Sequence, residues 1–538
     1  MSMSHVPMAP RQTPTPRDPV YASEAIVAAD HPLAVAAGAR VLQDGGNAVD
    51  AAIAVSAVLV VTKPNLSHLG GDAFLQVYWA GDGTTVAISS GGQAPRGATA
   101  ELFQAEGGIP THGVKAATIP GLVDAWAVAH RRWGTQPLAS LLAPAIHYAK
   151  DSFPLSQKVA WTLEQIAPFL ARFPTTSRLF LKDGRSPQAG EVLMQGDVAR
   201  TLEAIAQGGS DAFYRGDIAQ RIARFCHQEG GLLTEEDLAE YYAETAEPIH
   251  TDYRGYTVYE QPPNSQGHIL LEALNIVEAF DLSTLLPQKP AVAIHLMVEA
   301  IKLAFADRDR YAGDPRYVDM PLAMLLSRKH AAERRRQIDT QRVGPLATPA
   351  AERGDTTSFV VADRWGNMVT FIQSVFYSFG CGVVAGDTGV LLNNRLSRFS
   401  LAAGHPNRLE PGKRTMHTLN TYMVFKDGSP LLVGGTPGGD YQVQTNLQVL
   451  TNLLDLGLDV QRAIDAPRWG YTAELGLQLE ERFPEAVVQE LRALGHQVSL
   501  LHPWAISSGR AQVIVRDPHT GSYVAGSDSR GEGCALGI

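Results

Sequence analysis

Cysteine is scarce in this sequence, and its scarcity argues against two kinds of structural site. The 538 residues include three cysteines, Cys226, Cys381 and Cys534, which lie far apart and form no C-x-x-C pair. An odd and scattered set of this kind predicts neither a disulfide scaffold nor a zinc site. We therefore expect a fold stabilised by its hydrophobic core.

The sequence also lacks a long apolar run and a secretory signal. Residues 1–25 are rich in proline and polar side chains, without the apolar segment that signal peptides carry. The most apolar run, residues 51–61, is too short to span a bilayer and indicates a buried helix. We expect a cytosolic protein, not a membrane protein, with a disordered tail at residues 1–20.

Positive charge is in deficit. The formal net charge is −10, with 45% hydrophobic and 19% charged residues. This acidic balance argues against general binding to nucleic acid or to anionic membranes, although it says little about a local anion site. The length and apolar content are ample for a large core, in one large domain or in several.

The most informative stretch runs from residue 354 to residue 400. Two threonines follow an acidic residue and open a β-type run that extends to residue 362, and a turn-forming D-R-W-G-N separates this run from a second one, residues 368–375. The pattern predicts a β-hairpin with Thr356 at the mouth of its first strand. On these residues alone, the Thr-Thr pair is also what β-propensity produces at a strand start.

A threonine hydroxyl becomes an effective nucleophile when a base takes its proton. A threonine at a chain N-terminus can use its own α-amine, whose ordinary pKa is about 7.7 to 8.0. Here that chemistry requires the chain to cut itself between Asp355 and Thr356. The preceding residues, 340–355, contain two prolines and two glycines with little periodicity, which favours a mobile segment that can move away after scission.

This stretch resembles the γ-glutamyltransferase family. Members carry a processing site before a threonine, then a G-N turn, then F-G-x-G-V-V-x-G-x-x-G-x-x-L-N-N. The matching residues here are Gly354, Thr356, Thr357, Gly366, Asn367, Phe379, Gly380, Gly382, Val383, Val384, Gly386, Gly389, Leu392, Asn393 and Asn394. Further family motifs at 45–51, 436–439 and 465–471 extend the resemblance over nearly the whole chain apart from the tail.

The resemblance implies an α+β fold, the four-layer αββα sandwich of N-terminal-nucleophile hydrolases, with antiparallel sheets between helical layers. Autoproteolysis would give a large subunit, residues 21–355 after the tail, and a small subunit, residues 356–538. Both would form one intertwined domain and stay associated as a heterodimer, and a further pairing into a dimer of heterodimers is left open.

The resemblance also assigns the catalytic roles. Thr356 Oγ1 would attack an amide carbonyl while its α-amine carries the proton, and water would resolve the acyl-enzyme without a metal or an organic cofactor. Gly438 and Gly439 lie between a strand and a helix, where free N–H groups and the helix dipole favour an oxyanion. Ser374 stands in place of a family threonine that steadies the nucleophile.

The sequence departs from the family where members bind the α-amine and α-carboxylate of a γ-glutamyl group. Aligned by the motifs, Gly91, Phe376 and Arg398 replace the arginine, asparagine and aspartate that serve as these ligands. An arginine where a carboxylate met an ammonium group reverses the sign of the preferred ligand. We expect Arg395 and Arg398, with Arg414, to bind a carboxylate, unless they point to solvent or pair with acidic neighbours.

Four more residues complete the expected substrate site. His417 and Thr418 replace the serine pair that holds the substrate carboxylate in family members, and Asp440 is a candidate to orient an amide NH₂ or the nucleophile's ammonium. Asn394 closes the L-N-N motif beside them. The charged residues of a helical run, Lys302, Asp307, Arg308 and Asp309, are expected to be structural.

These departures imply hydrolysis of a small amide that bears a nearby carboxylate. The chain looks most like the divergent branch that includes oxamate amidohydrolases, enzymes of purine-derived nitrogen catabolism that release ammonia. Two alternatives remain. One is a γ-glutamyl hydrolase or transferase, or an acylase for glutaryl-type amides such as those of cephalosporins, with a rearranged site. The other is an uncleaved, catalytically silent binding protein that keeps only the scaffold.

Overall fold

The structure, a computed structural model, describes residues 17–345 and 354–538. Most of the predicted tail, residues 1–16, lies outside these ranges, and Val20 already begins the first strand. The predicted mobile segment, residues 340–355, is described only at its two ends. At the first end Gly344 is bonded on both sides, because its N–H donates to Glu299 and its carbonyl accepts from Lys302.

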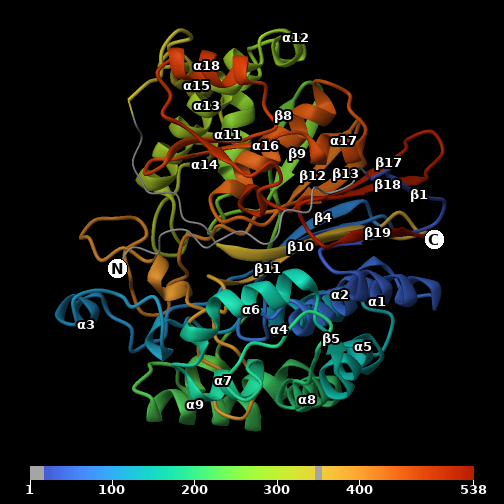
Figure 1. Cartoon of the computed structure of the whole chain (residues 1–538), viewed down its shortest axis with the longest axis vertical. Coiled ribbons are helices and arrows are strands. Elements are labelled where there is room, and N and C mark those ends of the chain that lie inside the picture. Colours follow the sequence, from blue (N-terminus) through green and yellow to red (C-terminus); the bar gives the residue numbers. More distant parts are fainter. Residues whose placement is uncertain (1–16, 346–353) are drawn as a thin grey trace.

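Two antiparallel sheets of seven strands stack face to face in the middle of the molecule (Figure 1). The first sheet runs β19 (Cys534–Gly537), β2 (Ile26–Ala29), β10 (Asp355–Ala362), β11 (Met368–Phe376), β3 (Asp72–Trp79), β4 (Thr84–Ser90) and β7 (Glu244–Ala246). The second runs β1 (Val20–Ala22), β18 (Tyr523–Ser527), β17 (Gln512–Arg516), β13 (Ser429–Gly435), β12 (Tyr422–Lys426), β9 (Tyr256–Glu260) and β8 (Ile249–Tyr253). The predicted hairpin is present as β10 and β11.

Helices cover the outer face of each sheet (Figure 1). On the side of the first sheet lie α1 (Pro32–Gln43), α2 (Ala48–Thr62), α4 (Leu122–Trp133), α5 (Leu138–Asp151), α6 (Gln157–Leu170), α7 (Pro174–Phe180), α8 (Gly196–Tyr214) and α9 (Asp217–Gln228). On the side of the second lie α11 (Gly267–Val277), α12 (Leu282–Gln288), α13 (Pro290–Tyr311), α14 (Leu322–Leu325), α15 (Arg328–Arg335), α16 (Tyr441–Leu454), α17 (Val460–Asp465) and α18 (Glu485–Ala493). This arrangement confirms the predicted αββα sandwich.

Smaller elements complete the chain. They are the helices α3 (Ala100–Ala105) and α10 (Glu235–Ala239), the strand pair β5 (Phe153–Pro154) and β6 (Val192–Leu193), and a small sheet of β14 (Trp469–Thr472), β15 (Gly476–Glu480) and β16 (Val498–Leu501). Three short 3₁₀ turns, η1 (Val114–Ala116), η2 (Arg395–Arg398) and η3 (Ile506–Ser508), lie in the connections.

The alternation of side chains along β10 shows how the layers hold together. Phe359 and Val361 pack into the core under α2, whereas Val360 and Ala362 pack against the second sheet. Successive residues of a strand point to opposite faces, so a strand buried on both faces is apolar throughout. This explains why the run after Thr356 contains no charged side chain.

The apolar run at residues 51–61 forms α2, and every residue of this helix is buried. Asn47 and Asp50 form a capping box that satisfies the first N–H groups of the helix. No helix within residues 17–345 and 354–538 is long and apolar enough to cross a membrane.

Candidate active site

Thr356 lies at an irregular point of the first sheet. On one side, Asp355 pairs with Phe376 and Thr357 pairs with Gln373, so the register of β10 and β11 shifts at Thr356. On the other side, β2 pairs with β10 only from Phe359 onward. A bulge of this kind re-aims one side chain and frees its peptide from the regular ladder.

A chain of hydroxyl groups connects Thr356 to the peptide that precedes it. The Thr356 hydroxyl donates to Ser374 Oγ at 3.2 Å, and the Ser374 hydroxyl donates to the carbonyl oxygen of Asp355 at 2.7 Å. The N–H of Phe376 donates to Ser374 Oγ at 2.8 Å and fixes that hydroxyl. The serine therefore bonds both the candidate nucleophile and the carbonyl that the nucleophile would attack during self-cleavage.

This arrangement suits an N-to-O acyl shift at the Asp355–Thr356 bond. When Thr356 Oγ1 bonds to the Asp355 carbonyl carbon, its proton has a path through Ser374 toward the carbonyl oxygen, which gains negative charge. The carboxyl group of Asp355 is buried, and burial raises its pKa while the nearby cation of Arg510 opposes this effect. The peptide C–N bond then breaks, and the proton passes to the departing nitrogen, which becomes the free α-amine of Thr356. Hydrolysis of the resulting ester would release the Asp355 carboxylate and restore the Thr356 hydroxyl, with the α-amine available as its base.

The loop of residues 436–439, which we call the oxyanion loop, lies beside the nucleophile's strand. A Cβ placed on Gly354 would lie 3.6 Å from Gly439 Cα. Gly438 and Gly439 have φ of 134° and 61°, values that glycine adopts readily. Within the described parts of the chain, neither amide N–H donates a hydrogen bond, and α16 begins one residue later, after its N-cap Asp440. These two N–H groups therefore have the character of an oxyanion site.

One ionic cluster of the site joins Arg395 to Asp72. Arg395 Nε lies 3.2 Å from Asp72 Oδ2, and its Nη1 donates to Thr418 Oγ1 at 3.5 Å. The guanidinium also stacks over the ring of Phe376, with 4.3 Å from Cζ to the ring centroid. Asp72 pairs with Ser374 in the β3–β11 register, which brings this cluster next to the hydroxyl chain.

His417 belongs to the same cluster and is neutral. Its Nδ1 accepts from the N–H of Leu419 at 3.2 Å, so Nε2 carries the proton and donates to Asp72 at 3.1 Å. Burial and the neighbouring cation of Arg395 lower the pKa of His417 to about 4, against the opposing effect of Asp72. Its charge is therefore constant at physiological pH, and Asp72 and Leu419 occupy both ring nitrogens.

A second ionic cluster is centred on Asp440, which directly follows the oxyanion loop. Its Oδ1 accepts from Arg308 Nη1 at 2.6 Å and lies 3.3 Å from Arg398 Nη2. The same Arg308 nitrogen donates to Gln266 Oε1 at 3.0 Å, and Gln266 Nε2 donates to the carbonyl of Gly439 at 3.2 Å. Asp440 is thus paired with two arginines.

Gly91, the position that resemblance aligns with the family arginine, is closely packed. A Cβ placed there would lie 3.2 Å from His417 Cδ2 and 3.3 Å from Phe74 Cζ. A longer side chain at this position would have to displace those two rings. The space that an arginine would need is thus filled by His417 and Phe74.

Two expected ligands face elsewhere. The side chain of Asn394 accepts from the N–H of Tyr377 at 3.1 Å and donates to the carbonyl of Thr111 at 3.0 Å, so both ends of its amide bond to backbone. Arg414 donates to the Gly91 carbonyl at 3.1 Å and to the Tyr242 carbonyl, and pairs with Glu244. Both side chains therefore brace the backbone around the site.

Sequence reasoning missed three contributors to the site: Asp72, Gln266 and Arg308. The sequence predicts only a structural role for Arg308, because its helical run gives no sign of what this side chain faces. Asp72 is placed beside Ser374 by strand register, and Gln266 by the entry into α11, and neither relation is visible locally. The only local signal is that Asp72 directly follows the Gly70-Gly71 pair.

Two buried groups of side chains have the composition of metal sites. Their ligand atoms lie within 4.8 Å of one another in the sets His295, Glu299 and His496, and Glu272, Asp307 and His330. In each set a cation already neutralises a carboxylate: Lys302 Nζ lies 2.7 Å from Glu299, and Arg334 pairs with Asp307. A metal ion would compete with these ammonium and guanidinium groups, so both sets have the character of structural ion networks.

Comparison with known proteins agrees with this architecture. The model of the gamma-glutamyltranspeptidase family matches residues 34–538. The glutathione hydrolase-like YwrD proenzyme of Bacillus subtilis is 40% identical over 528 residues, which cover 96% of this chain and 99% of that protein. The oxamate amidohydrolase proenzyme of Klebsiella pneumoniae is 34% identical over 521 residues, covering 95% and 97%.

A solved structure is similar over the whole length. The crystal structure of cephalosporin acylase from Bacillus halodurans superposes with a TM-score of 0.93 at 38% identity and covers 99% of both chains. The relatives are named proenzymes, which agrees with a precursor processed into subunits. The chain belongs to the gamma-glutamyltranspeptidase family, as an amidohydrolase of the N-terminal-nucleophile type that uses a threonine nucleophile.

Proposed function

We propose that this enzyme cleaves itself before Thr356 and then hydrolyses a small amide with a carboxylate close to the amide carbon, an oxamate-like substrate, with release of ammonia. Thr356 Oγ1 forms the ester bond to the acyl group, and its proton passes through the α-amine to the departing nitrogen. Water then cleaves the ester and regenerates the hydroxyl. The N–H groups of Gly438 and Gly439 stabilise the oxyanion in both steps.

The observation that carries the substrate proposal is the position of Arg398. Its guanidinium lies 3.3 Å from Asp440, the residue that directly follows the oxyanion glycines. A substrate ammonium group would be repelled by this cation, whereas a carboxylate would be attracted. In this proposal Arg395 and Arg398 face the carboxylate, and Asp440 holds Arg398 in place instead of binding an ammonium group.

The surroundings of Gly91 support the same proposal. Family members that bind a γ-glutamyl group use an arginine at the aligned position, and here His417 and Phe74 fill the space. Phe376 lies against Arg395 and adds an apolar face. A short, compact acyl group fits this environment better than an extended peptide such as glutathione.

A second candidate is an acylase for glutaryl-type amides. The likeness to the cephalosporin acylase from Bacillus halodurans favours it, and a glutaryl chain also carries a carboxylate without an ammonium group. The two candidates differ in the distance between carboxylate and amide. A third, a glutathione hydrolase, differs in requiring the α-ammonium group.

The test is release of the leaving amine, ammonia from the primary amides and aniline from the anilides, over a series in which one feature changes at a time. Oxamate, malonamate, succinamate and glutaramate lengthen the spacer between the carboxylate and the amide. Glutamine is glutaramate with an added α-ammonium group, and γ-glutamyl anilide relates to glutaryl anilide in the same way. We expect kcat/KM to be highest at the short end, and to exceed the value for the ammonium-bearing partner in each matched pair.

The outcomes separate the candidates. A maximum at glutaramate and glutaryl anilide would favour the acylase, and a preference for glutamine and γ-glutamyl anilide would contradict the arginine argument. Arg398→Met supplies the site control, because it leaves Asp440 paired with Arg308. We expect it to raise KM for the carboxylate amides by about 10-fold or more, in line with the loss of a charge-assisted contact. Unchanged kinetics would place Arg398 outside the substrate site.

A further inference from the structure

Arg510 lies between η3 and β17, outside the motifs that point to the active site. Its side chain is 9% exposed. Nε donates to Asp30 Oδ2 at 2.9 Å, and Nη2 donates to the main-chain carbonyl of Thr356 at 2.7 Å. The backbone N–H of Arg510 donates to Thr436 Oγ1 at 3.0 Å. One residue therefore contacts both the nucleophile's own peptide and the first residue of the oxyanion loop.

The carbonyl of Thr356 needs such a donor. It lies at the bulge in the β10–β11 register and before the β2–β10 ladder begins, so the regular sheet pattern does not extend to it. The guanidinium of Arg510 supplies the bond there, and Asp30 holds the guanidinium. Because the carbonyl and Oγ1 belong to one residue, fixing that peptide plane also restricts the direction of the Cβ–Oγ1 bond.

The other contact of this segment depends on a glycine. Gly509 has φ of 93°, and a Cβ there would lie 2.3 Å from Thr436 Oγ1 and 3.1 Å from the carbonyl of Pro437. Only a residue without a side chain permits this approach. The backbone at residues 509 and 510 therefore packs directly on the start of the oxyanion loop.

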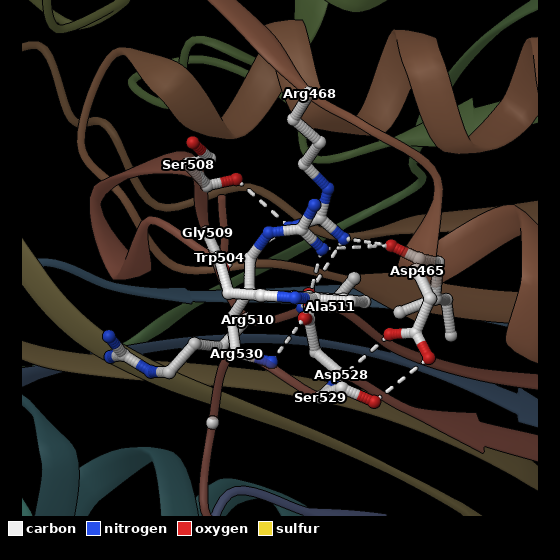
Figure 2. A network of polar contacts seen from close by, with 12 residues as sticks. Asp465, Arg468, Trp504, Ser508, Gly509, Arg510, Ala511, Asp528, Ser529 and Arg530 are labelled. Carbon is white, nitrogen blue, oxygen red and sulfur yellow. Dashed lines mark hydrogen bonds and ion pairs between the residues drawn. The ribbon is translucent and has the colours of Figure 1, made fainter. Parts of the chain in front are cut away.

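A buried ionic cluster that includes Arg468 and Asp528 holds the backbone of residues 508–511 in place (Figure 2). Arg468 Nη1 donates to the carbonyls of Ser508 at 3.0 Å and Gly509 at 3.2 Å. Asp528 accepts from the N–H of Ala511 at 2.8 Å and lies 2.6 Å from Arg468 Nη2. In Figure 2 the side chain of Arg510 points away from this cluster. Its Nη2 reaches the carbonyl of Thr356.

We propose that Arg510 is a positioning residue that holds Thr356 and the oxyanion loop in register with each other. Its guanidinium fixes the nucleophile's peptide and its N–H fixes Thr436. The backbone of residues 508–511, which Arg468 and Asp528 hold in place, connects these two contacts. The proposal rests on Thr356 as the nucleophile and is independent of which amide the enzyme hydrolyses. A planar guanidinium suits the role, because it can bond Asp30 and a carbonyl in fixed directions.

Self-cleavage of the precursor is the substrate-independent readout, because the scissile bond belongs to the chain. Arg510→Met removes both side-chain donors, and we expect the first-order rate of cleavage at Thr356 to fall by about 100-fold, the scale of a small misplacement of reacting groups. Arg510→Lys keeps the charge and a donor, so it should recover part of the loss. A rate within about 3-fold of wild type in Arg510→Met would overturn the proposal.

Arg482→Met is the matched control. Arg482 is a partly buried arginine that packs over Trp504 and pairs with Glu480, yet it contacts neither Thr356 nor Thr436. We expect it to lower the melting temperature as Arg510→Met does, with a cleavage rate close to wild type. If both variants slow cleavage equally, the effect comes from lost stability and the proposal fails.

A third variant covers the case in which Arg510→Met does not fold. Thr436→Val removes the acceptor of the Arg510 N–H without touching the nucleophile's carbonyl. In a double-mutant cycle with Arg510→Lys, the combined slowing should be smaller than the product of the single effects, because both changes break one link. A combined effect equal to that product would show that the two contacts act independently, contrary to the proposal.

Discussion

Two residues, Ser374 and Arg510, form hydrogen bonds to the carbonyl groups on either side of the Thr356 backbone nitrogen and Cα. Ser374 bonds the Asp355 carbonyl, which exists in this position only before cleavage, whereas Arg510 bonds the carbonyl of Thr356 itself, which persists afterward. A substitution at Ser374 should therefore affect maturation more than turnover, whereas a substitution at Arg510 should affect both. This difference follows from the proposed function, in which Thr356 acts first on its own chain and then on a substrate.

Replacing the nucleophile should stop both reactions. In Thr356→Ala no hydroxyl remains to attack the Asp355 carbonyl, so the chain should stay at full length and hydrolyse none of the amides. Thr356→Ser restores a hydroxyl and should cleave at a reduced rate. A denaturing gel over prolonged incubation, with N-terminal sequencing of the small fragment, measures this. Cleavage of Thr356→Ala at the same bond would show that the assignment of the nucleophile is wrong.

Ser374→Ala should impair maturation more than turnover. It removes the donor to the Asp355 carbonyl, and loss of one such donor costs about 100-fold to 1,000-fold in comparable oxyanion sites. Once cleavage is complete that carbonyl no longer precedes the nucleophile, so kcat of the mature variant should fall much less. Ser374→Thr keeps a hydroxyl and should mature normally. Equal losses in both reactions would assign Ser374 to the nucleophile alone.

At the scale of elements, the sequence predicts those helices and strands whose positions are set by hydrophobic periodicity and by capping residues. The Asn47 cap, the apolar run of α2 and the two strands of the hairpin all appear in the structure close to the expected positions. The bulge at Thr356 has no such signal, because it arises from the register of β10 against β11. The ionic cluster of Arg398, Asp440 and Arg308 is not predictable for a similar reason. The run that contains Arg308 predicts a helix, but not which residues its side chains contact.

The last strand shows how one carboxylate links distant elements. Glu532, just before β19, pairs with Lys63 at the end of α2 and accepts from the Ser156 hydroxyl at 2.9 Å and the Lys158 N–H at 3.0 Å at the start of α6. Burial alone would raise the pKa of Glu532, but Lys63 and these hydrogen bonds outweigh it and lower the pKa to about 2. The carboxylate form is therefore favoured by folding.

This difference in pKa between the folded and unfolded states predicts that Glu532→Gln lowers the free energy of unfolding by an amount that depends on pH. A lowered pKa in the folded state adds stability above the ordinary value near 4.5, and that stability disappears as the pH falls toward 2. At pH 7 the free energy of unfolding of the variant should be lower than that of wild type by on the order of 2 kcal/mol. This difference should shrink steadily below pH 4.5. Urea unfolding of the Thr356→Ala precursor from pH 3 to 7 measures it.

An exposed pair supplies the control for that measurement. Glu101 pairs with Arg408 at 3.0 Å, and the Glu101 side chain is 73% exposed. Exposed ion pairs contribute little, so Glu101→Gln should change stability by less than about 1 kcal/mol at any pH. A pH-independent loss in Glu532→Gln would mean that packing and not charge makes this contact.

At the scale of the whole molecule, the two fragments share both sheets. In the first, β10, β11 and β19 come from residues 356–538, apart from Asp355 at the start of β10. There β2 of the larger fragment lies between β19 and β10, and β3, β4 and β7 of the larger fragment follow β11. In the second, the small fragment supplies β12, β13, β17 and β18, and the large one supplies both edges. The sequence predicts the sandwich through family resemblance, but this pairing order depends on long-range contacts that periodicity does not report.

Because both sheets contain strands of both fragments, we expect the two fragments to stay associated in one complex after cleavage. Each fragment alone would expose strand edges and the apolar faces that now pack between the layers, so neither should fold by itself. After complete cleavage, gel filtration should show the two fragments in one peak at equal amounts, and this should persist at 1 M salt because buried apolar contacts and strand ladders are not screened. Only a denaturant should separate them. If the fragments part in native buffer, or if residues 356–538 expressed alone give a cooperative unfolding transition, the shared sheets cannot be the main source of stability. Adding the two fragments back together after dilution from urea provides the converse measurement, since recovered activity would require both sheets to reassemble from two chains.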